Sequence, residues 1–221
     1  MIALLVALLA YIPSSGSLIR KAAARAQGGS KSREVALIGT LTASGEPAHP
    51  GVQLVLRFPL HCKFEGDGVS VSVAAGKGEG SAGPALKLLQ LACPLIAYRG
   101  LPRAEAEQAL RSAAEQNGAD LTGGSGITRL LDRPVWVLGA GPREAARPQL
   151  WLYKESHAPA RLIAQGGVDL RLLQYGDPAA AEWFPRVLEL WEGGQLSARF
   201  EVLETHGMKN AGEDEEDDSR E

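Results

Sequence analysis

The sequence predicts an α+β protein that is mainly β, in which helices interrupt an antiparallel sheet. Three observations support this. The last third of the chain holds six short β-rich runs with turn signals between them. Strands joined so tightly must pair antiparallel, because a parallel crossover needs about a dozen residues or more. Two runs nearer the N-terminus alternate apolar and polar residues with a period of two, as half-buried strands do. Helical patterns fill the interval between these two groups of strands.

The expected elements follow in order along the chain. A short amphipathic helix at 17–26 precedes strands at 34–43 and 52–58. Two more strands, at 62–64 and 69–73, flank Glu65-Gly-Asp-Gly68, whose Asp-Gly pair is a strong hairpin signal. Helices are expected at 84–91 and 103–117, and a flexible Gly123-Gly-Ser-Gly126 loop then leads back into the sheet. The closing strands are expected at 134–138, 149–153, 159–163, 168–173, 186–191 and 196–203.

Size and charge predict one folded domain, at 18–206, followed by a tail. The chain has 221 residues, of which 45% are hydrophobic and 22% charged, enough for one sizeable core. Its net charge of -3 is uneven, because residues 209–221 carry -5 and the rest carries +2. We therefore expect 207–221 to be a disordered acidic tail, either solvating or a hook for a basic partner. Nucleic-acid binding is disfavoured, since no basic stripe with interleaved aromatic residues occurs.

The N-terminus is typical of an export signal. Residues 1–12 are uninterrupted apolar sequence, the right length for the central part of a secretory signal, and Ser15 and Ser17 are spaced as around a cleavage site. We expect a signal peptide at 1–17 and a periplasmic location, with a buried or anchoring N-terminal helix as the alternative. No cysteine follows the apolar run, so a lipoprotein-type lipid anchor has no acceptor there.

The two cysteines agree with export. Cys62 ends a strand-like run and Cys93 lies in a helical pattern. In an oxidising compartment we expect one disulfide between them, and two independent buried thiols are the alternative. The four histidines have no metal-ligand spacing, so no metal site is expected.

One motif favours an enzyme. Residues Gly78-Glu-Gly-Ser-Ala-Gly83 match G-x-G-x-x-G between a strand and a helix, as a dinucleotide site requires. Against it, Glu79 and the missing basic residue suit pyrophosphate poorly, so a glycine-rich hinge is the preferred interpretation. Other catalytic arrangements are absent from the sequence. We expect no enzyme and no cofactor, and a nucleotide-binding enzyme remains a third possibility.

Several segments together resemble a known family. The closest local likenesses are Glu34-Val-Ala-Leu-Ile-Gly-Thr-Leu-Thr42, Arg133-Pro-Val-Trp-Val-Leu-Gly-Ala140, Pro148-Gln-Leu-Trp-Leu-Tyr-Lys154, Ala158-Pro-Ala-Arg-Leu162 and the closing hairpin at 184–202. In this order they are similar to the periplasmic lipoprotein-sorting carriers of the LolA and LolB type. The resemblance implies a curved antiparallel sheet, an incomplete barrel, with helices covering its concave face and acyl chains held inside.

The apolar alternation permits such a cavity. The expected lipid-binding residues are Val35, Leu37, Leu54, Leu56, Phe58, Val135, Val137, Leu150, Leu152, Leu170 and Leu172. The same residues could instead pack on the helices as a dry core, because every half-buried sheet alternates in this way. Two functions stay open: a monomeric carrier of lipoprotein acyl chains or other lipids in outer-membrane lipoprotein sorting, and a regulatory module of the same fold that binds an envelope protein partner.

Overall fold

The computed structural model describes residues 12–26, 34–144, 146–176 and 184–206. The predicted tail and most of the predicted signal peptide therefore lie outside the described residues. The elements are α1 (Ser15–Ala26), β1 (Glu34–Ala43), β2 (His49–Arg57), β3 (His61–Gly66), β4 (Val69–Ala74), β5 (Lys77–Gly80), α2 (Pro84–Ile96), α3 (Arg103–Gln116), β6 (Ser125–Leu130), β7 (Arg133–Leu138), β8 (Gln149–Tyr153), β9 (Pro159–Ala164), a short 3₁₀ turn η1 (Gln165–Gly167), β10 (Val168–Tyr175), β11 (Pro185–Glu192) and β12 (Gln195–His206).

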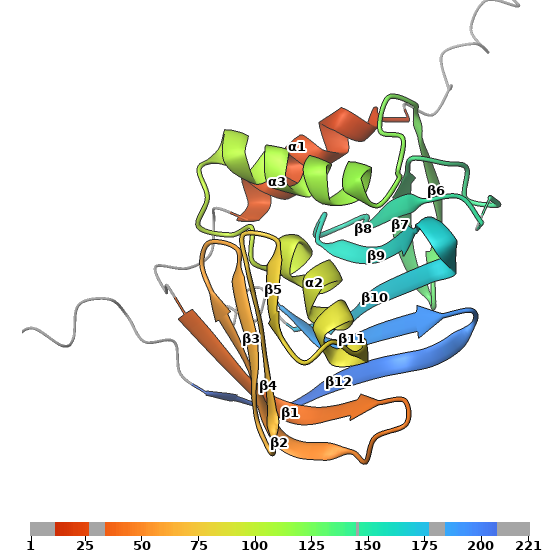
Figure 1. The fold of residues 1–221 in the computed structure, drawn as a ribbon. Coiled ribbons are helices and arrows are strands. Elements are labelled where there is room, and N and C mark those ends of the chain that lie inside the picture. Colours follow the sequence, from red (N-terminus) through yellow and green to blue (C-terminus); the bar gives the residue numbers. More distant parts are fainter. Residues whose placement is uncertain (1–11, 27–33, 145, 177–183, 207–221) are drawn as a thin grey trace, which may run out of the picture.

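The twelve strands of the described residues form one antiparallel sheet. Its order is β5-β4-β3-β2-β1-β12-β11-β10-β9-β8-β7-β6, so two meanders meet where β1 pairs with β12. The sheet does not close, and β5 and β6 form its edges. Figure 1 shows it curving around α2, while α1 and α3 lie side by side at one end. The predicted fold class, a curved antiparallel sheet with helices against it, is confirmed.

The junction between the two meanders depends on a glycine. At Gly39 of β1 a Cβ atom would lie 2.2 Å from the carbonyl oxygen of Glu201 and 2.9 Å from the ring of Phe200. No side chain fits there, because real Cβ atoms do not approach other atoms so closely. Gly39 thus lets β1 come close enough to β12 to join the two halves into one sheet.

Helix α2 fills the concave face. Its buried side chains, Leu88, Leu89, Ala92, Leu95 and Ile96 among them, join the main hydrophobic core with the inward-facing residues of the sheet. A disulfide between Cys62 of β3 and Cys93 of α2 fastens the helix to the strands. Since burial of an aliphatic side chain contributes about 1.5–3 kcal/mol, this contact supplies a large share of the stability of the fold.

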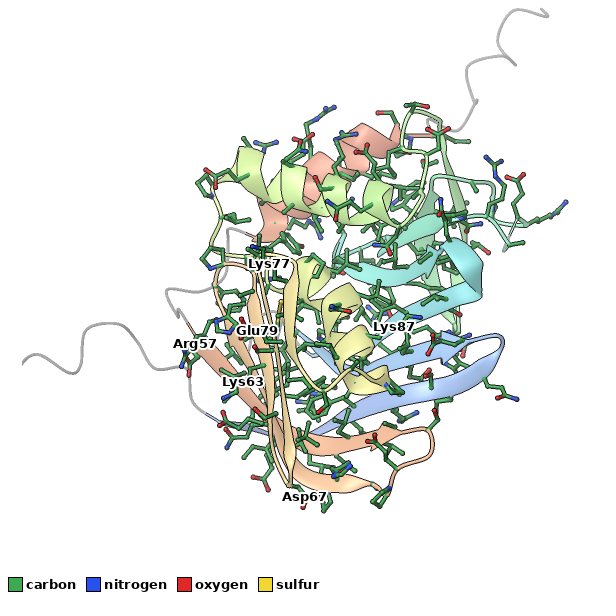
Figure 2. The ribbon with its side chains drawn as sticks, in the orientation of Figure 1. Arg57, Lys63, Asp67, Lys77, Glu79 and Lys87 are labelled. Carbon is green, nitrogen blue, oxygen red and sulfur yellow. A yellow bond between two sulfur atoms is a disulfide. The ribbon has the colours of Figure 1, made fainter. Side chains whose placement is uncertain are left out.

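The outer face of the second meander carries an ordered ladder of charges and rings. Asp169 of β10 accepts two hydrogen bonds from Arg161 of β9, both at 2.7 Å, and others from Arg171. These two arginines also lie over Trp151 and Trp191, each 4.6 Å from the ring centroid. On the first meander the outer face is more exposed, and the labelled charged residues of β2 to β5 lie at the surface in Figure 2.

Most predicted elements are present, with differences at the edges. Helix α2 continues beyond the predicted residue 91 to Ile96, through Pro94. Pro94 has no N–H to donate to the carbonyl oxygen of Gln90, and burial of Leu95 and Ile96 in the core offsets this loss. Strands β5 and β6 were not predicted, because neither shows apolar alternation. The hairpin predicted at residues 65–68 is confirmed, since Asp67 and Gly68 both have positive φ, 48° and 76°.

The chain before α1 is held by the loop that precedes β6. Ser14 forms a β-bridge with Gly124, and the hydroxyl of Ser15 donates to the carbonyl oxygen of Gly123 at 3.1 Å. The hydroxyl of Ser125 donates to the carbonyl oxygen of Pro13 at 2.6 Å. The helix predicted at 17–26 begins at Ser15, two residues earlier, and so its first turn lies inside the segment assigned to the signal peptide. Export and cleavage stay predictions.

Candidate ligand pocket

The structure gathers most of the predicted lipid-binding residues into the main core. Eight of them belong to this core and are at most 2% exposed, and the half-buried Phe58 packs against it. The eight are Val35, Leu37, Leu54, Leu56, Leu150, Leu152, Leu170 and Leu172. They share this core with buried side chains of α1, α2 and α3, an arrangement that matches the dry core named as the alternative. Their role in lipid binding stays a prediction.

Val135 and Val137 do not share this face. In the pairing of β7 with β8, Val137 lies opposite Trp151, whereas Trp136 lies opposite Leu152. Both valines belong to a second, smaller core with Trp151 and Tyr153. Their inclusion in one inner surface with Leu150 and Leu152 was wrong, because alternation identifies two faces of a strand but does not say which one turns inward.

The glycine motif at 78–83 does not lie wholly where either sequence interpretation expected it, between a strand and a helix. Residues 77–80 form the edge strand β5, so the first half of the motif is neither a phosphate-binding turn nor the expected hinge. At Gly78 a Cβ atom would lie 2.5 Å from the amide nitrogen of Gln90 and 3.0 Å from Leu86, both on α2. The space beside Gly78 is thus filled by side chains of α2, not left open for a ligand.

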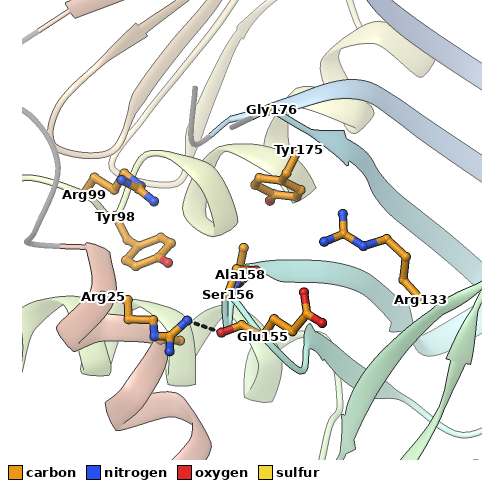
Figure 3. Close-up of a pocket in the computed structure, with 10 residues that line it drawn as sticks. Arg25, Tyr98, Arg99, Arg133, Glu155, Ser156, Ala158, Tyr175 and Gly176 are labelled. Atoms are coloured by element: carbon orange, nitrogen blue, oxygen red, sulfur yellow. Dashed lines mark hydrogen bonds between the residues drawn. The ribbon is translucent and has the colours of Figure 1, made fainter. Parts of the chain in front are cut away.

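A pocket of about 400 Å³ opens where the helices meet the second meander. Figure 3 shows how α1, the segment after α2, the start of β7, the β8–β9 turn and the end of β10 contribute to it. The lining residues are Ala22, Arg25, Tyr98, Arg99, Arg133, Glu155, Ser156, Ala158, Tyr175 and Gly176. Its volume lies within the range of about 300–1,000 Å³ that is usual for small-molecule sites.

Three arginines give the pocket a positive charge, which Glu155 offsets in part. Arg25, in the last turn of α1, donates a hydrogen bond to the carbonyl oxygen of Glu155. The guanidinium of Arg133 lies 4.6 Å from the centroid of the Tyr153 ring. Burial, opposed by the neighbouring Tyr98 and Tyr175, lowers the pKa of Arg99 to about 10. Arg99 is still cationic at neutral pH, in a setting that is partly removed from water.

Two tyrosines supply flat apolar surface and neutral hydroxyls. Burial raises the pKa of Tyr98 to about 12 and raises that of Tyr175 well above its ordinary value. The Tyr175 hydroxyl donates to the carbonyl oxygen of Pro159 at 2.8 Å, and its ring meets Tyr153 edge to face, with centroids 5.7 Å apart. These contacts hold the Tyr175 ring in place as one wall of the pocket.

The β8–β9 turn that borders the pocket contains an unusual histidine. His157 has a positive φ of 58°, and its buried Nδ1 atom has no hydrogen-bond partner in the described part of the chain. Burial, followed by the charges of Arg25 and Lys21 on α1, lowers the pKa of His157. The imidazole is therefore neutral at pH 7, and its protonation would place a third positive charge beside α1.

None of the eleven predicted residues lines this pocket. Its residues come from a helix end, a loop, a turn and the ends of two strands, and no periodic pattern in the sequence connects them. An arginine beside a tyrosine, as at Tyr98-Arg99, is the one local signal, and it is too common to be diagnostic. Among the described residues, no group of three or more histidine, cysteine or acidic side chains could hold a metal, and no helix has the length and apolarity to cross a membrane.

Comparison with known proteins gives structural likenesses only. No family model matches the sequence, and no curated protein is significantly similar to it. The structure is similar to that of a LolA superfamily protein from Nitrosomonas europaea, with a TM-score of 0.36 and 10% identity over 87% of this chain and 93% of that one. It is also similar to that of a DUF1329 family protein from Desulfovibrio piger, with a TM-score of 0.41 and 8% identity over 88% of this chain and 93% of that one.

A third likeness is to MucB of Pseudomonas aeruginosa in complex with MucA. Its TM-score is 0.28 and its identity 12%, over 87% of this chain and 56% of that one. The chain thus spans just over half of the MucB chain. The first of these structures belongs to the LolA superfamily, which is also the family that the sequence segments resemble. At such identities each likeness concerns the fold alone.

Proposed function

We propose that the protein is a non-catalytic binding protein of the cell envelope that carries the acyl part of a lipid or lipoprotein. The observation that carries this proposal is the pocket between α1, the end of α2 and the β8–β9 turn. Its apolar walls are two tyrosine rings and two alanines, and its polar groups converge on the same space from Arg25, Arg99, Arg133, Glu155 and Ser156. This combination is typical of sites that take an amphiphilic small molecule.

Burial of methylene groups supplies affinity of the right order for a carrier. Each buried methylene contributes about 0.8 kcal/mol, so six of them would contribute about 5 kcal/mol. That corresponds to a dissociation constant of roughly 0.2 mM before any polar contact is added. Such a ligand is held but can be passed on.

The concave face is the less favourable place for the same ligand. An acyl chain could reach Leu54 or Leu150 only if the core that they share with the helices, α2 among them, opened and exposed its apolar side chains. The disulfide between Cys62 and Cys93 opposes that movement. Binding in the open pocket requires no such cost.

The periplasm is the proposed location. The apolar run at 1–12 supports export, and the disulfide supports an oxidising compartment. Lipoprotein sorting is the process in which a soluble acyl-chain carrier of this kind would act.

Native mass spectrometry of the protein purified from its own host tests the proposal. We expect an added mass that organic extraction identifies as a lipid. Ser156→Trp should place a ring in the pocket and remove this mass, whereas Lys154→Trp, two residues away on the exposed side of the same turn, should keep it. A clean apo mass, together with no binding of added amphiphiles, would contradict the carrier.

A second candidate function is an envelope module that binds a protein partner. Its specific support is the open edge at β6, where Ile127 is 50% exposed and Leu131, in the following turn, is 74% exposed. An extended peptide can add to such an edge as a further strand. Co-purification of a protein in place of a lipid would favour this function, and Ile127→Lys should then release that protein.

A further inference from the structure

We infer that the pocket selects amphiphiles with an anionic head group, a carboxylate or a phosphate monoester, and that Arg25, Arg99 and Arg133 bind this group. The inference rests on the proposed function, because it concerns the same pocket. It goes further in naming the chemistry of the ligand and the side chains that recognise it.

The three arginines reach one cavity from separate parts of the fold. Arg25 comes from the end of α1, Arg99 from the segment after α2 and Arg133 from the start of β7. In Figure 3 their side chains surround the space that Tyr98 and Tyr175 border. Three cations and the single carboxylate of Glu155 leave a net charge of +2 on the lining, although the whole chain carries -3. A local excess of this sign attracts anions.

The present contacts of Arg25 and Arg133 leave their donor capacity largely available. A guanidinium carries five N–H donors in a planar fork that matches a carboxylate or phosphate. Arg25 uses one donor for the carbonyl oxygen of Glu155. Arg133 lies over the face of the Tyr153 ring, a cation–π contact that is not a hydrogen bond. Both can therefore bind an anion without first losing these contacts.

Burial makes the Arg99 charge a strong partner for an anion. Removal of water disfavours the cation, as its lowered pKa shows. An anion brought beside it offsets this cost, and charge-assisted hydrogen bonds are stronger where water is excluded. The neutral phenols of Tyr98 and Tyr175 add no opposing charge.

The remaining walls determine what the rest of the ligand must be. Ala22 and Ala158 line the pocket beside the tyrosine rings and offer no hydrogen-bonding side chain. A fully hydrophilic anion such as inorganic phosphate would leave this surface without a partner. A single chain that ends in an anionic group matches both parts of the lining.

Three ligands of equal chain length test the inference by isothermal titration calorimetry on the full chain, below their micelle concentrations. They are dodecanoate, monododecyl phosphate and the neutral dodecanol. We expect at least one of the two anions to bind more than tenfold more tightly than dodecanol, and their order identifies the carboxylate or the phosphate. Equal binding of all three would overturn the inference and leave the proposed carrier standing. Binding of none would contradict the carrier and the inference together.

Variants of the arginines provide the second arm of the test. Arg133→Gln and Arg25→Gln should each weaken the preferred anion about tenfold, as expected for loss of one charge-assisted contact, and leave dodecanol unchanged. Arg129→Gln is the matched control, since it lies on the same β6–β7 hairpin, is exposed and does not line the pocket. Circular dichroism would verify that each variant is folded. If both pocket variants bind the anion as tightly as the control does, the assignment of these arginines is wrong.

Discussion

Replacement of Leu54 by alanine tests whether the concave face is a dry core or a ligand-binding surface. Leu54 is 1% exposed, and the sheet places it between Leu37 of β1 and Phe64 of β3. A Leu→Ala change in a packed core costs about 2–5 kcal/mol, depending on how far the surroundings can close the cavity. Here both neighbouring strands and the disulfide-linked α2 restrict such closure. We therefore expect about 3–4 kcal/mol, a large part of the roughly 5–15 kcal/mol that holds a domain folded.

Urea denaturation followed by circular dichroism measures this loss, and titration with dodecanoate on the same protein measures binding. We expect Leu54→Ala to lower the free energy of unfolding while the affinity of the folded protein stays within about twofold. Val55→Ala is the matched control, because Val55 is the next residue of β2 and faces the opposite side. Its cost should be about 1 kcal/mol or less. A Leu54→Ala variant with nearly full stability and a large loss of affinity would refute the dry core and restore the concave face as the binding site.

Three further predictions concern other parts of the chain. Replacement of Cys62 and Cys93 together by alanine should lower the free energy of unfolding by about 3.5 kcal/mol, as loop closure over a separation of 31 residues implies; equal urea midpoints, or two free thiols in the oxidised protein after denaturation, would contradict it. Deletion of 210–221, which contains no large apolar residue, should leave the thermal midpoint in calorimetry within about two degrees. Because the pKa of His157 is lowered on folding, the unfolded chain takes up the proton first, and stability should fall as pH decreases below about 6.5. His157→Asn, which suits a positive φ, should reduce the difference between urea midpoints at pH 7 and pH 5; an unchanged difference would exclude His157 as its source.

The antiparallel meanders could be predicted because their connections are short and their strands alternate. The segments at 134–138 and 149–153 match β7 and β8 within one residue. Edge strands gave no such signal. Residues 77–80 are all exposed and two of them are glycines, so nothing in their pattern indicates a buried face. The helix predicted at 84–91 also stopped short of the end of α2, because Pro94 is unfavourable in a helix and only the tertiary packing of Leu95 and Ile96 overrides that local preference.

The pocket could not be predicted, because its residues are brought together only by the fold. Arg25 and Arg133 are more than one hundred positions apart, and each stands near the end of its own element. The predicted lipid-binding residues failed to identify it for a related reason. Alternation finds residues that are removed from water, but an open pocket and a packed core both require such residues. The pairing register between strands decides which face of a strand turns toward the core. In the register of β7 with β8, Val135 and Val137 lie on the face opposite to Leu150 and Leu152.

Hydrogen–deuterium exchange of the full chain, with and without the preferred amphiphile, tests most directly whether the pocket is the binding site. We expect the ligand to slow exchange at Tyr98 and Arg99 and at the β8–β9 turn that carries Glu155 and Ser156. Exchange in α2 from Leu88 to Ile96, over the concave face, should stay unchanged. Changed exchange throughout α2 and β2, with none at the turn, would show that the ligand enters the sheet and would contradict the placement of the site.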